Sequence, residues 1–247
     1  MRNRHSELAF FAQDFRDKNG LNEIESIRIK SILHKNNILT IYRSLSSGFA
    51  GMCAIININT ENKARFLLIN SEHTIGKQHF TICHELYHLY FQKDFKHRIC
   101  IDVGNFNKQT KDTDEYDADL FAVNLLLPER GVWNMIPETE RKKNKIQIST
   151  VISIEQYYAS SHSALLFRLF NMNLIDEKYK EELSYGVKNI AQRLGYNTDL
   201  YEKGNNNVRI GDYGTLAYKA WNKGIISESM YFSLLEDIGI DVSKLFE

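Results

Sequence analysis

Hydrophobic and polar positions alternate with two different periods along this chain. A helical period predicts one helix over residues 7–17 and a second around residues 27–33. Runs of β-branched and aromatic residues then predict strands at 38–42, 51–58 and 65–70. A polar run between the last two strands, at 59–63, is typical of a hairpin connection, so we expect a small antiparallel sheet.

Two further helices follow the predicted sheet. The first runs from about residue 75 to residue 91, with Thr74 as its N-terminal cap and an apolar stripe made of Ile75, Ile82, Cys83, Leu86 and Leu89. A polar stretch to about residue 111 separates it from the second helix, over residues 112–127. Pro128 ends that helix, because proline disfavours helical geometry at the residue before it.

The second half of the chain is mainly helical. A highly charged segment at 137–144 is the best candidate for a domain boundary, which divides the chain into 1–136 and 137–247. Helical patterns follow it at 147–158, 162–171, 177–194 and 214–235. The predicted fold is therefore α+β: a small antiparallel sheet packed on two neighbouring helices, followed by a helical C-terminal region.

Charge and cysteine content narrow the classes of function. The 31 lysines and arginines equal the 31 aspartates and glutamates, so no overall positive field favours nucleic acid or an anionic membrane. No apolar run approaches the roughly 18 residues of a membrane span, and the N-terminus lacks an apolar signal core, so we expect a cytoplasmic protein. Three cysteines without a short paired spacing, Cys53, Cys83 and Cys100, are expected to be reduced and mostly in the core.

The helix predicted at 75–91 carries the motif His84-Glu85-Leu86-Tyr87-His88. Residues four apart share a helix face, so His84 and His88 can bind one zinc ion, while Glu85 can act as general base on a water molecule. With 8 histidines in the chain, chance is expected to produce about 0.02 copies of this motif. A pair of core histidines is the structural alternative, and the zinc site is the interpretation that we favour.

A catalytic zinc site needs a third protein ligand, and Glu115 at the start of the next helix is the best candidate. Asp119, one turn further on, is expected to accept a hydrogen bond from a ligating histidine. The alternative is a solvated acidic helix start, which the helix dipole favours at Asp112 and Asp114. It fits Glu115 less well, because the apolar residues of that helix lie three and four positions away and turn Glu115 inward.

Two runs of sequence resemble the ImmA/IrrE family of metallopeptidases. The pattern F-T-x-x-H-E-x-x-H of that family is matched within residues 78–89, and its pattern E-x-x-A-N-x-F-A-x-x-L-L-x-P is matched at 115–128. The family usually has asparagine where this chain has Asp119 and often a small residue where it has Tyr87. The resemblance is specific over about residues 40–130. It implies that His84, His88 and Glu115 bind zinc and that Glu85 is the catalytic base.

The resemblance also implies a kind of substrate. Members of the family act as endopeptidases on transcriptional repressors, commonly helix-turn-helix proteins encoded nearby, and so switch on mobile-element or stress-response genes. Residues 52–58 or 65–70 are expected to offer a sheet edge on which an extended peptide lies. The electrophilic donor of such a reaction stays open among residues of suitable type, namely His73, His79, His97, Tyr87 and Tyr116.

Residues 147–171 resemble the helix-turn-helix-like segment that follows the peptidase part in this family. DNA binding is one interpretation, but no basic cluster lines the second helix, so we favour packing of Leu165, Leu166 and Leu169 against the rest of the protein. A non-catalytic regulatory protein, with zinc and with affinity for a repressor or DNA, is the alternative to a peptidase. Redox control through Cys83 is a further alternative to a structural role for that buried thiol.

Overall fold

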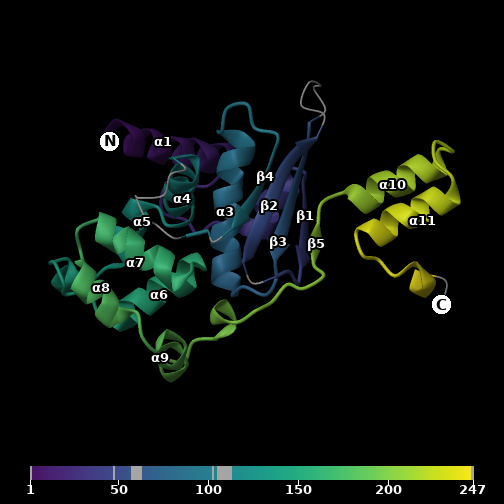
Figure 1. Ribbon diagram of the computed structural model, residues 1–247. Coiled ribbons are helices and arrows are strands. Elements are labelled where there is room, and N and C mark those ends of the chain that lie inside the picture. Colours follow the sequence, from purple (N-terminus) through teal and green to yellow (C-terminus); the bar gives the residue numbers. More distant parts are fainter. Residues whose placement is uncertain (1, 47, 57–62, 102, 105–112, 246–247) are drawn as a thin grey trace.

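The computed structural model describes residues 2–46, 48–56, 63–101, 103–104 and 113–245, and it confirms the α+β fold. One sheet lies at the centre, with a group of helices packed on one side and a separate helical pair at the C-terminal end (Figure 1). The predicted connection at 59–63 falls almost entirely outside the described residues, as do Asp112 and the end of the strand predicted at 51–58.

The sheet has five strands in the order β4-β2-β3-β1-β5 among the described residues. The strands are β1 (Ile38–Arg43), β2 (Phe49–Ile56), β3 (Ala64–Asn70), β4 (His97–Ile101) and β5 (Arg209–Ile210). The prediction of an antiparallel sheet was wrong in one respect, because β1 pairs with β3 in parallel while the other pairs are antiparallel. The expectation that β2 or β3 provides an edge was also wrong, since both are interior and the edges are β4 and β5.

Each face of the sheet packs against a different layer. In β1 the side chains of Ile38 and Tyr42 enter the main core, whereas Ile41 packs on the opposite face against Leu235 and Ile238 of the C-terminal region. This follows from the pleat, which directs successive side chains to opposite faces. The described part of the C-terminal region thus packs on β1 and β3, on the face of the sheet that is turned away from the main helical layer.

Three helices form the layer that positions the candidate site. They are α1 (Arg2–Lys18), α3 (Ile75–Tyr90) and α4 (Thr113–Leu126), with α3 packed on β2 and β3 and α4 packed between α1 and α3. The short helix α2 (Ile29–Lys35) leads into β1. Thr74 caps α3 as predicted, since its side chain accepts a hydrogen bond from the backbone amide of Lys77.

The remaining α-helices of the described residues follow α4. They comprise α5 (Glu129–Met135), α6 (Ile148–Tyr158), α7 (His162–Asn171), α8 (Glu177–Leu183), α9 (Val187–Arg193), α10 (Tyr213–Asn222) and α11 (Glu228–Asp237). Two of the four helical patterns in the second half, those at 147–158 and 162–171, are confirmed as α6 and α7, whereas each of the other two is divided into two shorter helices. The helix predicted at 177–194 is divided in two, because Gly186 adopts a left-handed conformation with φ +68° that an α-helix does not accommodate. The helix predicted at 214–235 is a helical hairpin that turns at Gly224, where φ is also +68°.

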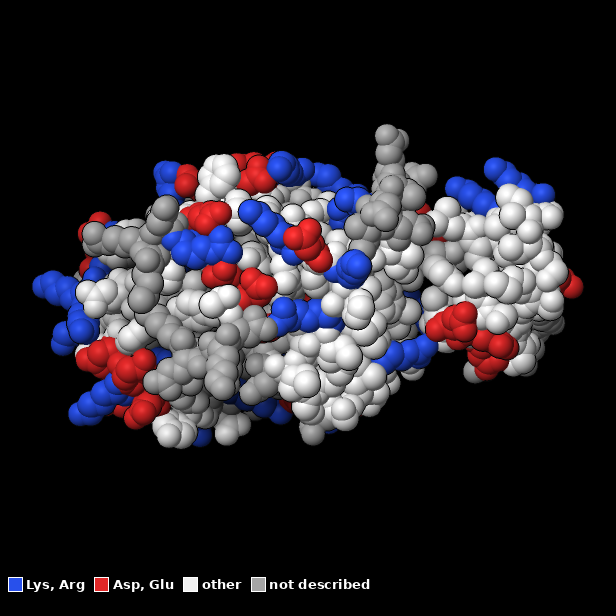
Figure 2. Space-filling view, turned by 45° about the horizontal axis from the view of Figure 1, so that its top comes forward, with Lys and Arg blue, Asp and Glu red and all other residues white. Residues whose placement is uncertain are grey.

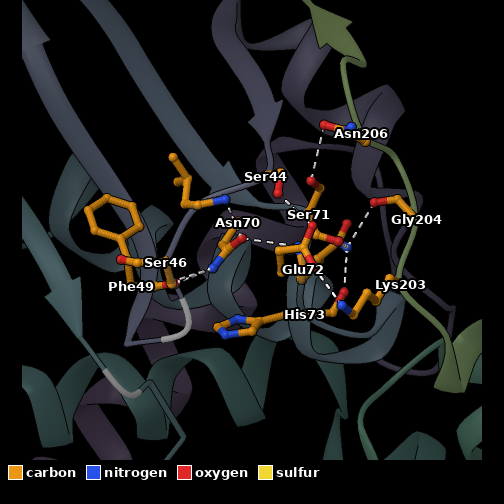
Figure 3. Close-up of polar contacts among 12 residues, drawn as sticks. Ser44, Ser46, Phe49, Asn70, Ser71, Glu72, His73, Lys203, Gly204 and Asn206 are labelled. Carbon is orange, nitrogen blue, oxygen red and sulfur yellow. Dashed lines mark hydrogen bonds and ion pairs between the residues drawn. The ribbon is translucent and has the colours of Figure 1, made fainter.

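Asn70, the last residue of β3, fixes the segment that leads into β2 (Figure 3). Its side-chain amide donates hydrogen bonds to the carbonyl oxygens of Ser46 at 3.1 Å and Phe49 at 2.6 Å. Its side-chain oxygen accepts one from the amide of Glu72 at 3.0 Å. A fully buried polar side chain is tolerated here because its hydrogen-bonding groups are satisfied.

Residues 203–206 run alongside the turn that precedes α3 (Figure 3). Lys203 forms an ion pair with Glu72 at 2.5 Å, and the Ser71 hydroxyl donates to the side-chain oxygen of Asn206 at 3.3 Å. Gln78, in the first turn of α3, donates to the carbonyl of Gly204 at 3.0 Å. A distant part of the chain therefore holds the beginning of the motif-bearing helix in place.

The packing of α7 bears on the proposed resemblance to a DNA-binding segment. Leu165, Leu166 and Leu169 are all buried in the main core, as the favoured interpretation predicted. Arg168 is buried too, and it donates to the carbonyl oxygen of Leu127 at 2.8 Å. Its guanidinium is thus used to satisfy the C-terminal end of α4 rather than displayed on the surface. The division of the chain at residue 137 stays a prediction, although α6 and α7 share the core that contains α3 and α4.

Acidic and basic side chains are interspersed on the face of the main body seen in Figure 2, in keeping with the equal numbers of the two charges. The C-terminal hairpin, at the right of that view, carries a broad uncharged area. Within the described ranges, no helix combines the length and the apolar character needed to cross a membrane.

Candidate metal centre

The motif residues lie in the C-terminal half of α3, with His88 in its last turn, on the side that faces the sheet and α4. His84, Glu85 and His88 are each no more than 1% exposed. The helix is apolar around them, so the two imidazoles are held in a dry environment in which a charged or polar group requires a partner.

The two imidazoles converge through their Nε2 atoms, which are 3.2 Å apart. The other ring nitrogens point to separate partners: His84 Nδ1 lies 2.8 Å from Asp119 Oδ1, and His88 Nδ1 lies 2.6 Å from Gln92 Oε1. Because both partners are acceptors, each Nδ1 carries the hydrogen and each Nε2 presents a lone pair in the neutral tautomer. Asp119 has the position that the sequence predicted for it, whereas Gln92 was missed.

Glu115 reaches the same point from the first turn of α4. Its Oε2 is 3.1 Å from His84 Nε2, and its Oε1 is 3.6 Å from His88 Nε2. The buried apolar face of α4, formed by Ala118, Phe121, Ala122 and Leu125, turns Glu115 inward as expected. Two other acidic residues of this helix also have side-chain partners: Asp114 accepts a hydrogen bond from Gln92 at 2.8 Å, and Asp117 one from Arg4 at 2.7 Å.

Strand β4 adds two residues that the sequence interpretation did not include in the site. Cys100 joins His84, His88 and Glu115 in a group whose potential ligand atoms all lie within 4.8 Å of one another. Arg98 forms an ion pair with Glu115 Oε1 at 2.5 Å, without the geometry of a hydrogen bond. The signal in the sequence was a short apolar run with two β-branched residues, Ile99 to Ile101, within a stretch that is otherwise polar. Only the pairing of β4 with β2 brings it beside α3.

The spacing of these atoms fits a tetrahedral metal. Two nitrogen or oxygen ligands at about 2.0–2.1 Å from zinc, separated by a tetrahedral angle, lie about 3.3 Å apart. The distances of 3.2 Å between the two Nε2 atoms and 3.1 Å from His84 to Glu115 agree with that value. Two imidazoles and a carboxylate are also a donor set that zinc accepts. His84, His88 and Glu115 therefore fit a zinc ion without rearrangement.

In the metal-free protein these groups shift one another's pKa values. Burial alone would lower the pKa of His84, but interactions with Asp119, Cys100 and Glu115 raise it well above its usual value. Burial and the adjacent His84 lower the pKa of His88 to about 3. Burial alone would raise the pKa of Glu115, but interactions with His84, His88 and Arg98 outweigh it and lower that pKa to about 2. Only one of the two imidazoles, that of His84, is therefore favoured in its charged form, as expected for like charges in contact.

Glu85 is fully buried, and neither of its carboxylate oxygens has a hydrogen-bond partner among the described groups. Burial raises its pKa, an effect that the neighbouring His84 opposes. β2 approaches closely here: a Cβ atom on Gly51 would lie 3.1 Å from Glu85 Oε1 and 2.9 Å from Thr81 Cγ2. A buried carboxylate without partners is costly unless it serves a ligand or a reaction.

The five residues considered as electrophilic donors to the reacting carbonyl do not gather at one place in the structure. His79 Nδ1 contacts the carbonyl of Ala159 at 2.8 Å, and the Tyr87 hydroxyl accepts a hydrogen bond from Arg4 at 3.0 Å, so both are engaged away from the histidine pair. Tyr116 faces the ring of His5 on α1. His97 is exposed on β4, and His73 lies at the turn before α3 (Figure 3).

The arrangement of a histidine pair on one helix, a buried glutamate between them and a carboxylate from the next helix is that of a metallopeptidase. Residues 48–170, about half of the chain, match the model of the IrrE N-terminal-like domain, peptidase family M78. The chain belongs to this family, in agreement with the resemblance drawn from its sequence. A comparison with curated proteins found no match.

Proposed function

We propose that this protein is a zinc-dependent endopeptidase. In this proposal His84, His88 and Glu115 hold the zinc ion, Glu85 is the catalytic base and Asp119 orients His84. The observation that carries the proposal is the convergence of two Nε2 atoms, 3.2 Å apart, with the Glu115 carboxylate, whose oxygens lie 3.1 Å from His84 Nε2 and 3.6 Å from His88 Nε2. Beside them lies the buried carboxylate of Glu85, whose oxygens have no hydrogen-bond partner among the described groups.

A zinc ion bound by these residues would polarise the peptide carbonyl and increase the acidity of a water molecule. Glu85 takes the proton of that water and passes it to the leaving amine. Its burial raises its pKa, which makes it a stronger proton acceptor than a solvated glutamate. Asp119 and Gln92 hold the imidazoles in the tautomer that leaves Nε2 free to donate its lone pair.

Arg98 contributes a positive charge on the same side of the site. Its ion pair with Glu115 balances the negative charge of that carboxylate and restricts its rotation. The same cation is suitably close to stabilise negative charge that develops on a peptide oxygen during attack.

The proposed substrate is a helix-turn-helix transcriptional repressor encoded near this gene, whose cleavage would release mobile-element or stress-response genes. Support comes from the family, whose peptidase character implies a protein substrate, and from the resemblance of the motifs. Edge strand β4 carries two of the site residues, so an extended segment of the substrate that pairs with this edge would lie next to the catalytic groups.

The test is to incubate the protein with the product of the neighbouring repressor gene, with zinc and with a chelator. Cleavage that requires zinc supports the proposal. In Glu85→Gln we expect metal content to be retained and cleavage to fall by at least about 10²-fold, the usual lower contribution of a general base. An intact repressor under zinc-replete conditions would exclude this substrate.

A second function is favoured by the fourth potential ligand, Cys100. Sites with four protein ligands are typical of structural zinc, whereas catalytic sites keep one position open. In that case the protein would be a regulatory molecule that binds a repressor or DNA without cutting it. Measurable binding of the repressor, unaffected by Glu85→Gln and never followed by cleavage, would identify this second function.

A further inference from the structure

Strand β4 directs alternate side chains to opposite sides. Ile99 and Ile101 are 56% and 69% exposed, whereas Cys100 between them is 1% exposed and faces α3. Arg98, two residues before Cys100, shares its side and reaches Glu115. The pleat of the strand therefore presents both a cation and a thiol to the candidate metal centre.

The surroundings of Cys100 are not those of an ordinary core cysteine. Its thiol lies within 4.8 Å of the ligand atoms of His84, His88 and Glu115. Burial raises the pKa of this thiol to about 12, while the neighbouring His84 lowers it. Opposite Cys100 in the β2–β4 pairing lies Gly51, which has no side chain to separate the thiol from α3. Cys83, by comparison, is equally buried but lies outside the group of potential ligands.

The thiol lies within 4.8 Å of every other potential ligand atom in the group. On a tetrahedral zinc ion, a sulfur at about 2.3 Å and a nitrogen at about 2.0 Å are separated by about 3.5 Å. A movement of roughly 1 Å therefore suffices to bring the sulfur into the coordination sphere. Such a movement is local, because β4 is an edge strand that pairs with β2 alone among the described strands.

We propose that Cys100 is the fourth protein ligand of the metal and closes the site in the resting protein. This inference rests on the proposed function, because it assumes that His84, His88 and Glu115 hold a metal. On metal binding the thiol loses its proton to solvent, and a bond forms between the thiolate and the metal. A shift of the Cys100 side chain away from the metal breaks that bond, the thiolate regains a proton from solvent and the fourth position opens, while Arg98 keeps its ion pair with Glu115. The peptidase is thus latent until Cys100 leaves the metal.

The test replaces zinc with cobalt(II), which occupies the same tetrahedral sites and reports its ligands by absorption. We expect wild-type protein to bind one equivalent of cobalt and to show a sulfur-to-cobalt charge-transfer band in the near ultraviolet. Cys100→Ala should bind cobalt at least tenfold more weakly and lose the band. Cys83→Ala, the matched control, removes a buried thiol one residue from His84 and should keep both the affinity and the band.

A small hydroxamate serves as a probe of the open position. It should alter the cobalt spectrum of Cys100→Ala at concentrations at least tenfold lower than those needed for wild-type protein. Equal sensitivity of the two proteins would show that Cys100 does not close the site.

The wild-type spectrum decides the question even if Cys100→Ala fails to fold. One equivalent of bound cobalt without the sulfur band overturns this inference and leaves the proposed function standing. Failure to bind any metal overturns both. A sulfur band together with a peptidase that is inactive even in Cys100→Ala supports the ligand assignment and contradicts the proposed function.

Discussion

Asp119 Oδ1 lies 2.8 Å from Nδ1 of His84, although 35 residues separate the two in the chain. The same oxygen accepts a hydrogen bond from the backbone amide of Gly104 at 3.2 Å. The carboxylate is therefore fixed on two sides, and it fixes the plane and the tautomer of the imidazole in turn. Metal affinity should depend on this contact even though Asp119 is not expected to touch the metal.

Replacement of Asp119 tests that dependence. We expect Asp119→Ala to weaken zinc binding about 10- to 100-fold, the usual effect of losing the acceptor behind a ligating histidine. Asp119→Asn keeps an oxygen acceptor and should weaken binding much less. Competition with a chromophoric chelator measures both affinities, and equal affinities of wild-type protein and Asp119→Ala would show that the contact is dispensable.

Removal of the metal should lower the thermal stability of the protein. A ligand at 1,000 times its dissociation constant stabilises the folded state by about 4 kcal/mol, and about 1 kcal/mol shifts the Tm of a chain of this size by about 2–4 °C. We therefore expect a chelator to lower Tm by about 8–16 °C in a thermal melt followed by circular dichroism. In His88→Ala the chelator should leave Tm almost unchanged, because this variant lacks a metal ligand. If the chelator did not change the Tm of the wild-type protein either, a bound metal would be excluded.

A methyl group at Gly51 should disturb both the fold and the catalytic carboxylate. The added Cβ would meet Thr81 and Glu85 at 2.9 Å and 3.1 Å, so one of these side chains must move. We expect Gly51→Ala to lose about 1–3 kcal/mol of unfolding free energy, as overpacked cores do, and to lose peptidase activity. Urea unfolding measures the first effect.

Gly48→Ala is the control for that substitution, because a Cβ there meets no atom within 4 Å. Its stability and activity should both stay near the wild-type values. If Gly51→Ala also kept the stability and activity of the wild-type protein, β2 and α3 would have to move apart more easily than their contacts indicate.

Arg168 is expected to be a stabilising residue rather than a contact for nucleic acid. It donates to the Leu127 carbonyl and to the side-chain oxygen of Asn124, both at 2.8 Å. Arg168→Met leaves these acceptors without a donor, which should cost about 1–3 kcal/mol of unfolding free energy for each group that stays buried. The comparison is Arg130→Ala, which removes an exposed ion pair with Glu23 and should cost less than about 1 kcal/mol. Equal losses in the two variants would contradict the assigned role.

The sequence alone determined the parts of this protein that depend on local pattern. The period of its apolar residues located α3, α4, α6 and α7, since a helix buries residues three and four apart whatever it packs against. The spacing of His84 and His88 places both on one face for the same reason. Glu115 and Asp119 could be chosen because an amphipathic helix turns them towards its buried side, and the three cysteines are free and buried as expected.

Only the tertiary structure decided what depends on contacts between distant segments. The sequence of a strand does not specify which other strand it pairs with. The parallel pairing of β1 with β3 and the addition of β4 and β5 to the sheet could therefore not be predicted from the spacing of apolar residues. The same is true of Cys100, Arg98 and Gln92, which reach the candidate metal centre through the edge strand or the end of α3. Local sequence thus supplied three potential ligands, and the sheet supplied a fourth, because only pairing with β2 sets a thiol from β4 beside the two imidazoles.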